Sequence, residues 1–166
     1  MANPTIISIP EVELPEEQGY APETGIVMEC PVRLGLRRDG TQLWTLPVEP
    51  LVSARGRKNV ILSNVLKKKR QGGIMELWSI DNYEVEIRGS LFSNQMGVYP
   101  AEQVARLKKL LEAEEVISIQ SLVTDALGIR YVVFTDWEFP DTKNIMWQDY
   151  RIRALSDTDI ELIESI

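Results

Sequence analysis

The chain has 166 residues, of which 44% are hydrophobic and 26% charged, values that are ordinary for a single globular domain with a substantial core. It contains no histidine and one cysteine, Cys30. These counts exclude Ser-His-Asp and Cys-His catalysis, nearly all catalytic zinc sites, and an internal disulfide. Enzymes that use only carboxylates, lysine or tyrosine remain open. We expect Cys30 to be a small buried hydrophobe.

The sequence predicts neither a membrane span nor a secretory signal. No apolar run approaches the length of about 18 residues that a spanning helix needs. The N-terminus has no basic start followed by an apolar stretch.

Charge is unevenly distributed along the chain. Residues 1–30 carry −6, residues 31–70 carry +8, and residues 71–166 carry −9, which together give the net charge of −7. Such segregation can guide the docking of one subunit onto another. Chance clustering on solvated surfaces is the alternative. The overall acidity argues against general nucleic-acid binding.

Residues 1–24 have the composition of an extended arm. Pro4, Pro10, Pro15 and Pro22 interrupt this segment, and proline fixes φ and removes a backbone donor. We expect the arm to be disordered in isolation and to lie against neighbouring subunits or its own domain.

Residues 25–166 are predicted to form one β-rich domain. Strand patterns occupy residues 41–50, 58–66, 74–80, 83–88, 116–120, 129–139 and 146–155. Residues 57–80 are predicted to form a hairpin with a long charged tip. Asp81 and Asn82 are typical of a two-residue turn leading into the next strand. In that strand Tyr83, Val85 and Ile87 alternate with charged residues, and Tyr150, Ile152 and Ala154 share one face of the last strand.

A helix is predicted near residues 100–113, starting at Pro100, where the missing N–H costs nothing. Its apolar stripe is expected to face the core, with Glu102, Arg106 and Lys109 facing away; the stripe consists of Ala101, Val104, Leu107 and Leu111. Residues 122–127 suggest a short helical turn closed by Gly128. Ser156 with Asp159 suggests a cap for a helix over residues 160–166.

These elements predict a mainly β fold of the α+β type. We expect a β-barrel or sandwich of about seven or eight strands, with one packed helix and the N-terminal arm.

No catalytic, cofactor-binding or metal-binding residue is predicted. The segment 35–41 has the glycines of a phosphate-binding loop but lacks its lysine. Glu84 with Glu86, and Asp136 with Glu138, could serve glycosidase chemistry at suitable separations. A solvated strand face explains both pairs more simply.

Predicted assembly contacts lie in the basic hairpin tip and the acidic arm. Four consecutive cations at the tip are expected to contact another chain, although a solvated loop is the alternative reading. The residues concerned are Lys67, Lys68, Lys69 and Arg70 in the tip, and Glu11, Glu13, Glu16 and Glu17 in the arm. Four tryptophans, Trp44, Trp78, Trp137 and Trp147, suit either a core or an interface.

The order of several short motifs over about residues 40–158 resembles an uncharacterised family of tail proteins from phages of Bacteroidetes. The motifs are Leu46 to Pro50, Gly72 to Glu76, Tyr83 to Gly89, Tyr99-Pro100, Ile129 to Val133, Phe139-Pro140 and Tyr150 to Asp157. The chain is more distantly similar to the N-terminal part of LysM-bearing baseplate or tail-hub proteins of contractile phages and related injection machines. The element order is also similar to tail-tube proteins. No LysM module follows, so the resemblance implies no peptidoglycan binding.

The resemblance implies a non-enzymatic structural subunit of a phage tail or related contractile injection machine, in the baseplate, hub or tube. It would be made in the bacterial cytoplasm and assembled into the virion with copies of itself and other tail proteins. We expect no cofactor, membrane insertion or specific nucleic-acid binding. An accessory binding module using the tryptophans, and a carboxylate-based cell-wall hydrolase, are the alternatives.

Overall fold

The computed structural model describes residues 19–20, 25–36, 42–63, 74–142 and 144–157. Their elements, in chain order, are β1 (Gly19–Tyr20), β2 (Val27–Met28), β3 (Arg33–Leu36), β4 (Trp44–Thr45), β5 (Leu51–Arg55), β6 (Lys58–Ser63), β7 (Ile74–Ile80), β8 (Glu84–Phe92), α1 (Ala101–Leu111), β9 (Ile117–Gln120), α2 (Leu122–Ala126), β10 (Tyr131–Glu138) and β11 (Trp147–Asp157).

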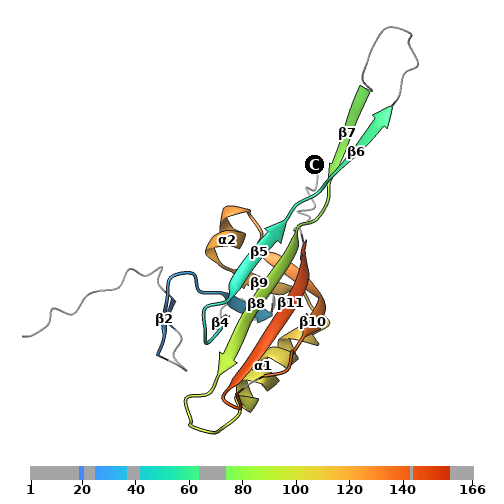
Figure 1. The fold of residues 1–166 in the computed structure, drawn as a ribbon. Coiled ribbons are helices and arrows are strands. Elements are labelled where there is room, and N and C mark those ends of the chain that lie inside the picture. The colour runs from blue at the N-terminus through green and yellow to red at the C-terminus, as the bar shows by residue number, and fades with distance from the viewer. Residues whose placement is uncertain (1–18, 21–24, 37–41, 64–73, 143, 158–166) are drawn as a thin grey trace, which may run out of the picture.

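Seven strands form one antiparallel sheet in the order β4-β3-β9-β10-β11-β8-β5. The sheet curls into a half-barrel beside α1 (Figure 1). Among the described residues the edge strands β4 and β5 do not pair with each other, so the barrel is open. The prediction of a mainly β fold with one packed helix is confirmed.

The core lies between the inner face of the sheet and α1. Along β11 every second residue is buried, and Tyr150, Ile152 and Ala154 join Val85 and Ile87 of β8 in one apolar cluster. The alternation places Arg151 and Arg153 of β11, which are exposed, and Glu86 of β8, which is half-buried, on the outer face. One face of the central strands therefore holds the fold together, and the other is a surface.

Helix α1 follows the predicted pattern with one exception. Its last turn carries Lys108 and Lys109, and Lys108 pairs with Glu112 at 3.6 Å. Leu107 and Leu111 are buried, and Val104 packs against the core. The prediction that Ala101 faces the core is wrong, because this residue is exposed at the start of the helix.

Helix α2 owes its start to a capping box that sequence reasoning missed. The Thr124 backbone N–H donates to the Ser121 hydroxyl at 3.2 Å, and the Ser121 N–H donates to the Thr124 hydroxyl at 3.0 Å. Such reciprocal bonds satisfy donors that have no partner within the helix. Gly128 follows the helix with φ +72°, the conformation expected of a closing glycine.

The predicted turn at Asp81 and Asn82 is wrong. Strand β7 pairs with β6 alone, whereas β8 pairs with β5 and β11. The chain passes from β7 into β8 in the same general direction, so β6–β7 continues the β5–β8 pair beyond the sheet (Figure 1). The Asp81 N–H donates to the Arg57 carbonyl at 2.9 Å, and this bond joins the β5–β6 segment to the β7–β8 segment at the junction. The hairpin predicted over residues 57–80 is confirmed by the β6–β7 pairing; its tip lies outside the described residues.

Three further expectations need correction. Cys30 is exposed rather than buried. Ser156 does not start a helix, because it belongs to β11 and its hydroxyl accepts the Tyr83 N–H at 2.8 Å; residues 158–166 lie outside the described part. Of the described residues 42–50, only Trp44–Thr45 forms a strand, so the strand predicted over residues 41–50 is too long.

The predicted arm lies mostly outside the described residues. Its Gly19–Tyr20 pair forms antiparallel contacts with Val27–Met28. The boundary at residue 24 remains a prediction.

Candidate assembly surfaces

The predicted contact residues in the tip and the arm all lie outside the described residues, so this pairing remains a prediction. They are Lys67, Lys68, Lys69, Arg70, Glu11, Glu13, Glu16 and Glu17. The structure does describe the strands that lead to the tip, and these strands show what kind of surface the hairpin offers.

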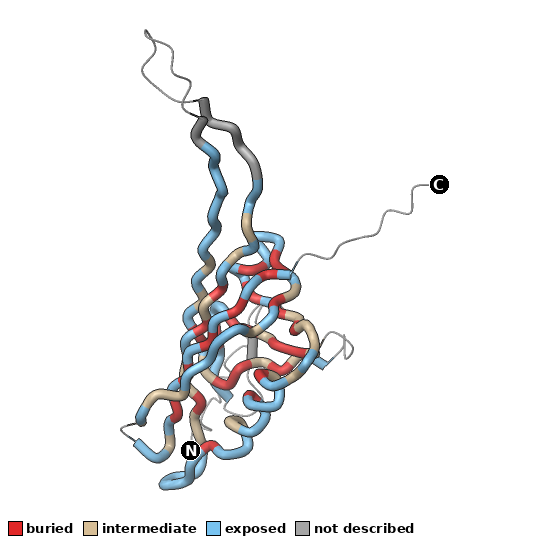
Figure 2. The backbone as a smooth tube through the Cα atoms, turned by 90° about the vertical axis from the view of Figure 1, so that its right-hand side faces the viewer, coloured by how far each residue is buried: buried red, intermediate tan, exposed pale blue. Residues whose placement is uncertain are grey.

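The shaft of the hairpin, β6 and β7, extends away from the body. Figure 2 colours residues 58–61 and 79–80 of the shaft as exposed, in contrast with the buried residues that gather in the body. Val60 and Ile61 are consecutive in a strand and therefore point to opposite faces, yet both are exposed. Neither face of the shaft is covered at this point by the chain's own core. Ile80, at the base, is 69% exposed.

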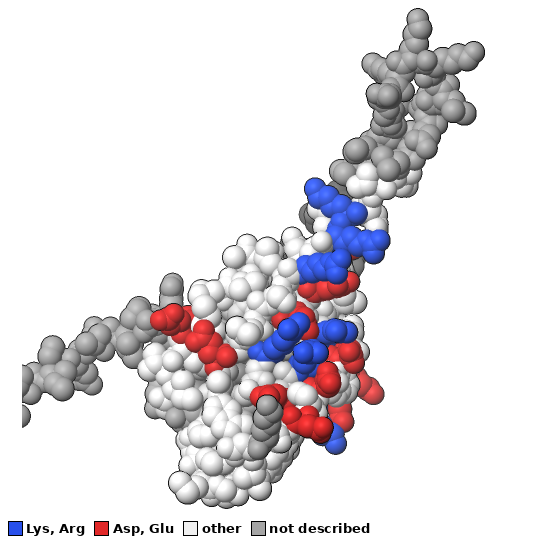
Figure 3. All heavy atoms as spheres, in the orientation of Figure 1, with Lys and Arg blue, Asp and Glu red and all other residues white. Residues whose placement is uncertain are grey.

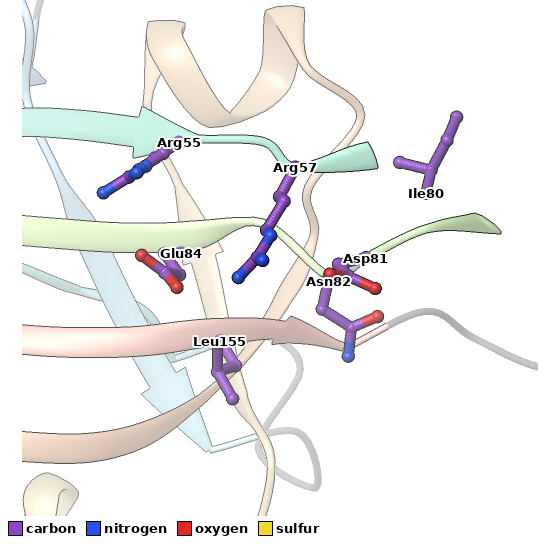
Figure 4. A pocket seen from close by; sticks show the side chains of 7 residues that line it. All are labelled: Arg55, Arg57, Ile80, Asp81, Asn82, Glu84 and Leu155. Atoms are coloured by element: carbon purple, nitrogen blue, oxygen red, sulfur yellow. The ribbon is translucent and has the colours of Figure 1, made fainter. Parts of the chain in front are cut away.

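A cavity of about 600 Å³ lies where the shaft meets the sheet (Figure 4). Arg55 and Arg57 come from the β5–β6 side, and Asp81 and Glu84 come from the β7–β8 side. Asp81 accepts a hydrogen bond from the Asn59 side chain at 2.8 Å. Within the described part of the chain, neither arginine forms an ion pair. The base of the hairpin therefore presents cationic groups to solvent, as Figure 3 also shows.

The outer face of the sheet carries crossed ion pairs. Glu86 is bound by Arg88 at 2.8 Å and lies 3.6 Å from Arg151 of the neighbouring strand. Arg151 also approaches Glu138 at 3.7 Å, and Arg153 approaches Asp136 at 3.7 Å. The hydrogen bond from Arg88, together with the nearby arginine charges, holds the pKa of Glu86 below its usual value against the opposing effect of desolvation. The same bond raises the pKa of Arg88.

This arrangement does not suit the carboxylates for acid–base catalysis. A general acid near neutral pH needs a carboxyl group whose pKa is raised, whereas the pKa of Glu86 is lowered. Asp136 and Glu138 are exposed on β10, and each carboxylate is paired with an arginine of β11. The described residues contain no group of three or more potential metal ligands. In the same residues, no helix is long and apolar enough to cross a membrane.

A third surface, absent from the sequence-based prediction, lies at the end of the sheet opposite the hairpin. Residues 93–99 follow β8 and residues 139–146 precede β11, and the Ser93 N–H donates to the Met146 carbonyl at 3.0 Å. Five apolar residues on these loops and at the adjoining start of β11 are exposed, and we call this end of the sheet the loop-end surface: Met96, Val98, Tyr99, Ile145 and Trp147. No periodicity marks them, because loop residues of two distant segments meet only when β8 and β11 pair.

The tryptophans do not converge on one described site. Trp44 is buried and has the Arg106 guanidinium 4.9 Å above its ring. Trp147 packs on Phe92 with ring centroids 4.5 Å apart, and Trp137 lies exposed on β10.

The fold is similar to that of a known phage protein. The crystal structure of SPP1 Dit, described as a paradigm of the hub adsorption apparatus in phages infecting Gram-positive bacteria, matches with a TM-score of 0.50 and 16% identity. The match covers 76% of this chain and 49% of that chain. At this identity the likeness concerns the fold.

Two matches come from gene transfer agent particles, at 18% identity, each covering 78% of this chain and 91% of the other. A chain from the tail of the empty particle has a TM-score of 0.46, and a chain from the native virion has a TM-score of 0.38.

No protein of curated function matches this sequence. A family match does extend over residues 45–165, from β4 through the hairpin and both helices to beyond β11. Because the match covers more than half of the chain, the protein belongs to the family described as a domain of unknown function, DUF6046.

Proposed function

We propose that this protein is a structural subunit of a virion tail, in the baseplate, hub or tube, and that it acts by assembling with copies of itself and with other tail proteins. The observation that carries the proposal is the exposed hairpin shaft. An isolated two-stranded hairpin is at best marginally stable in water, and this one displays Val60, Ile61 and Ile80 to solvent. A partner chain that packs against the hairpin would bury these apolar side chains.

The fold likeness to SPP1 Dit supports a tail as the setting, since that protein is described as part of a hub adsorption apparatus. The charge distribution supports assembly as the mode of action. In this proposal Lys67, Lys68, Lys69 and Arg70 contact acidic arm residues of another chain, Glu11, Glu13, Glu16 and Glu17. The protein is made in the bacterial cytoplasm and acts in the particle, without a cofactor, a membrane or specific nucleic-acid binding.

The test is the composition of purified particles. Quantitative mass spectrometry should find several copies of the chain per particle, and gold-labelled antibodies should bind at the tail. Absence from intact particles would refute the proposal.

Replacing the four tip cations by serine should prevent incorporation and leave the thermal midpoint of the isolated protein unchanged, because a tip contributes little to the core. The matched control is Lys109→Ser with Arg130→Ser, which removes exposed cations from the body. Normal incorporation of the tip variant would reject the tip as a contact.

A further inference from the structure

The two exposed apolar surfaces lie at opposite ends of one strand pair. Strand β8 begins at Glu84, beside the hairpin, and ends at Phe92, where it pairs with Trp147 of β11. Strand β8 is nine residues long, about 30 Å at ~3.3 Å per residue. The shaft leads away from the sheet at the first end (Figure 1). The two surfaces of one molecule therefore cannot cover each other.

The loop-end surface is held in a defined shape. Gln103 of α1 forms two hydrogen bonds with the backbone of Phe92, at 2.9 and 3.2 Å, and the Tyr99 hydroxyl donates to Gln148 at 2.7 Å. Gln103 and Tyr99 both line a groove of about 640 Å³, to which Val98 also contributes. Met96 nevertheless remains 92% exposed. The hydrogen bonds of Gln103 and Tyr99 reduce the conformational entropy that this part of the surface loses when it binds.

The two ends also differ in the sign of their charge. In the described part of this end, residues 55–63 and 74–80, there are three basic residues and one acidic residue, a net +2. The described residues 93–103, 138–142 and 144–149, at the loop-end surface, contain four acidic residues and no basic residue, a net −4. Opposite charges around apolar centres both attract and orient two partners.

We propose that the loop-end surface of one copy receives the hairpin shaft of a second copy. The contact is heterologous, because it joins two different surfaces, so each copy keeps one free shaft and one free loop end. Such contacts continue from copy to copy until a ring closes or a filament grows. This inference rests on the proposed assembly function and names two of the surfaces that carry it.

Two double variants of the full chain separate the two halves of the contact. Val60→Ser with Ile61→Ser disables the shaft, and Met96→Ser with Ile145→Ser disables the loop end. In sedimentation velocity at increasing concentration, the wild type should form species larger than the monomer. Each double variant alone should remain at the mass of one 18.9 kDa chain. An equimolar mixture should form a dimer and nothing larger, because it contains one intact shaft and one intact loop end per pair.

Leu51→Ser with Trp137→Ser is the matched control, since these exposed apolar residues lie opposite Arg88 and Ile152, in the middle of the sheet rather than at either end, and the change should leave assembly unchanged. Circular dichroism checks the fold of every variant. If the shaft variant unfolds, Lys58→Glu replaces it, because that change reverses a charge at an exposed position and keeps the apolar residues.

Three outcomes overturn the proposal: a wild type that stays monomeric, a double variant that assembles normally, or a mixture that stays monomeric. Loss of assembly in the control also overturns it, since the association would then be unspecific. None of these outcomes bears on whether the protein occurs in particles, so the proposed tail role is judged separately.

Discussion

Gly89 lies against Tyr150 in the centre of the sheet. A Cβ atom at this glycine would collide with the Tyr150 hydroxyl, lie 2.7 Å from Tyr150 Cζ and lie 3.1 Å from Pro50 Cβ. The hydroxyl is buried and has no hydrogen-bond partner among the described residues, and burial raises the pKa of Tyr150. Both facts point to a tightly packed position with no room to adjust.

We therefore predict that Gly89→Ala destabilises the protein by about 1–3 kcal/mol, the usual cost of overpacking a core. The sign of this free-energy change is informative. Without the collision, replacing glycine by alanine would stabilise the fold, because alanine restricts the unfolded chain. Urea unfolding measures the free-energy change. Removing the hydroxyl with Tyr150→Phe should cost little by itself and should recover part of the loss in the double variant. A strictly additive double variant would show that the hydroxyl is not the obstacle.

Glu86 provides a pH-dependent contribution to stability. The hydrogen bond from Arg88 lowers the pKa of Glu86 in the folded state. Its stabilisation is therefore present above the pKa of the unfolded chain, about 4.3, and is lost as the pH falls through the lower, folded-state value. Glu86→Gln should destabilise the protein at pH near 7 by no more than ~1 kcal/mol, the usual range for ion pairs at a surface.

The measurement is urea unfolding of wild type and Glu86→Gln over a series of pH values. The difference between the two should shrink as the solution becomes more acidic. Glu138→Gln, which removes a longer and more exposed pair, should have a smaller effect at neutral pH. A difference for Glu86→Gln that is the same at all pH values would show that the ion pairs do not stabilise the fold.

At the scale of elements, α1 is held by the apolar face that it buries. Leu107 is fully buried, and replacing a buried leucine by alanine typically costs about 2–5 kcal/mol. Domains of this size have about 5–15 kcal/mol of stability in total, so Leu107→Ala should lower the thermal midpoint clearly. Leu122→Ala is the control, because Leu122 of α2 is 52% exposed. An unchanged midpoint for Leu107→Ala, with assembly lost, would identify the stripe as an intersubunit surface instead.

The elements also show where sequence patterns stop being informative. Alternation in Tyr83, Val85 and Ile87 identified β8, and helical spacing identified α1, because both patterns follow from burying one face. The pairing partner of β8 was missed. A turn at Asp81 and Asn82 would have paired β8 with β7, but pairing with β5 and β11 places Val85 and Ile87 in the core.

At the scale of the whole molecule, the fold has an apolar core in the body and two uncovered ends. The basic hairpin occupies one end and the loop-end surface the other. Between them the outer face of the sheet carries ion pairs among its own residues, together with the exposed apolar side chains of Leu51, Val133 and Leu155. The two ends are where the proposed contact would cover exposed apolar residues, among them Ile61 and Met96.

The sequence by itself determined the mainly β class, the single main helix, the hairpin over residues 57–80 and the faces of β8 and β11. These follow from local periodicity and from the residues that start and stop elements. Only the tertiary structure decided which strands pair, that Cys30 and Ala101 are exposed, and that the segments after β8 and before β11 meet at one end of the sheet. Such facts depend on contacts between residues far apart in the chain. A local sequence pattern does not determine which distant segment will pack against it.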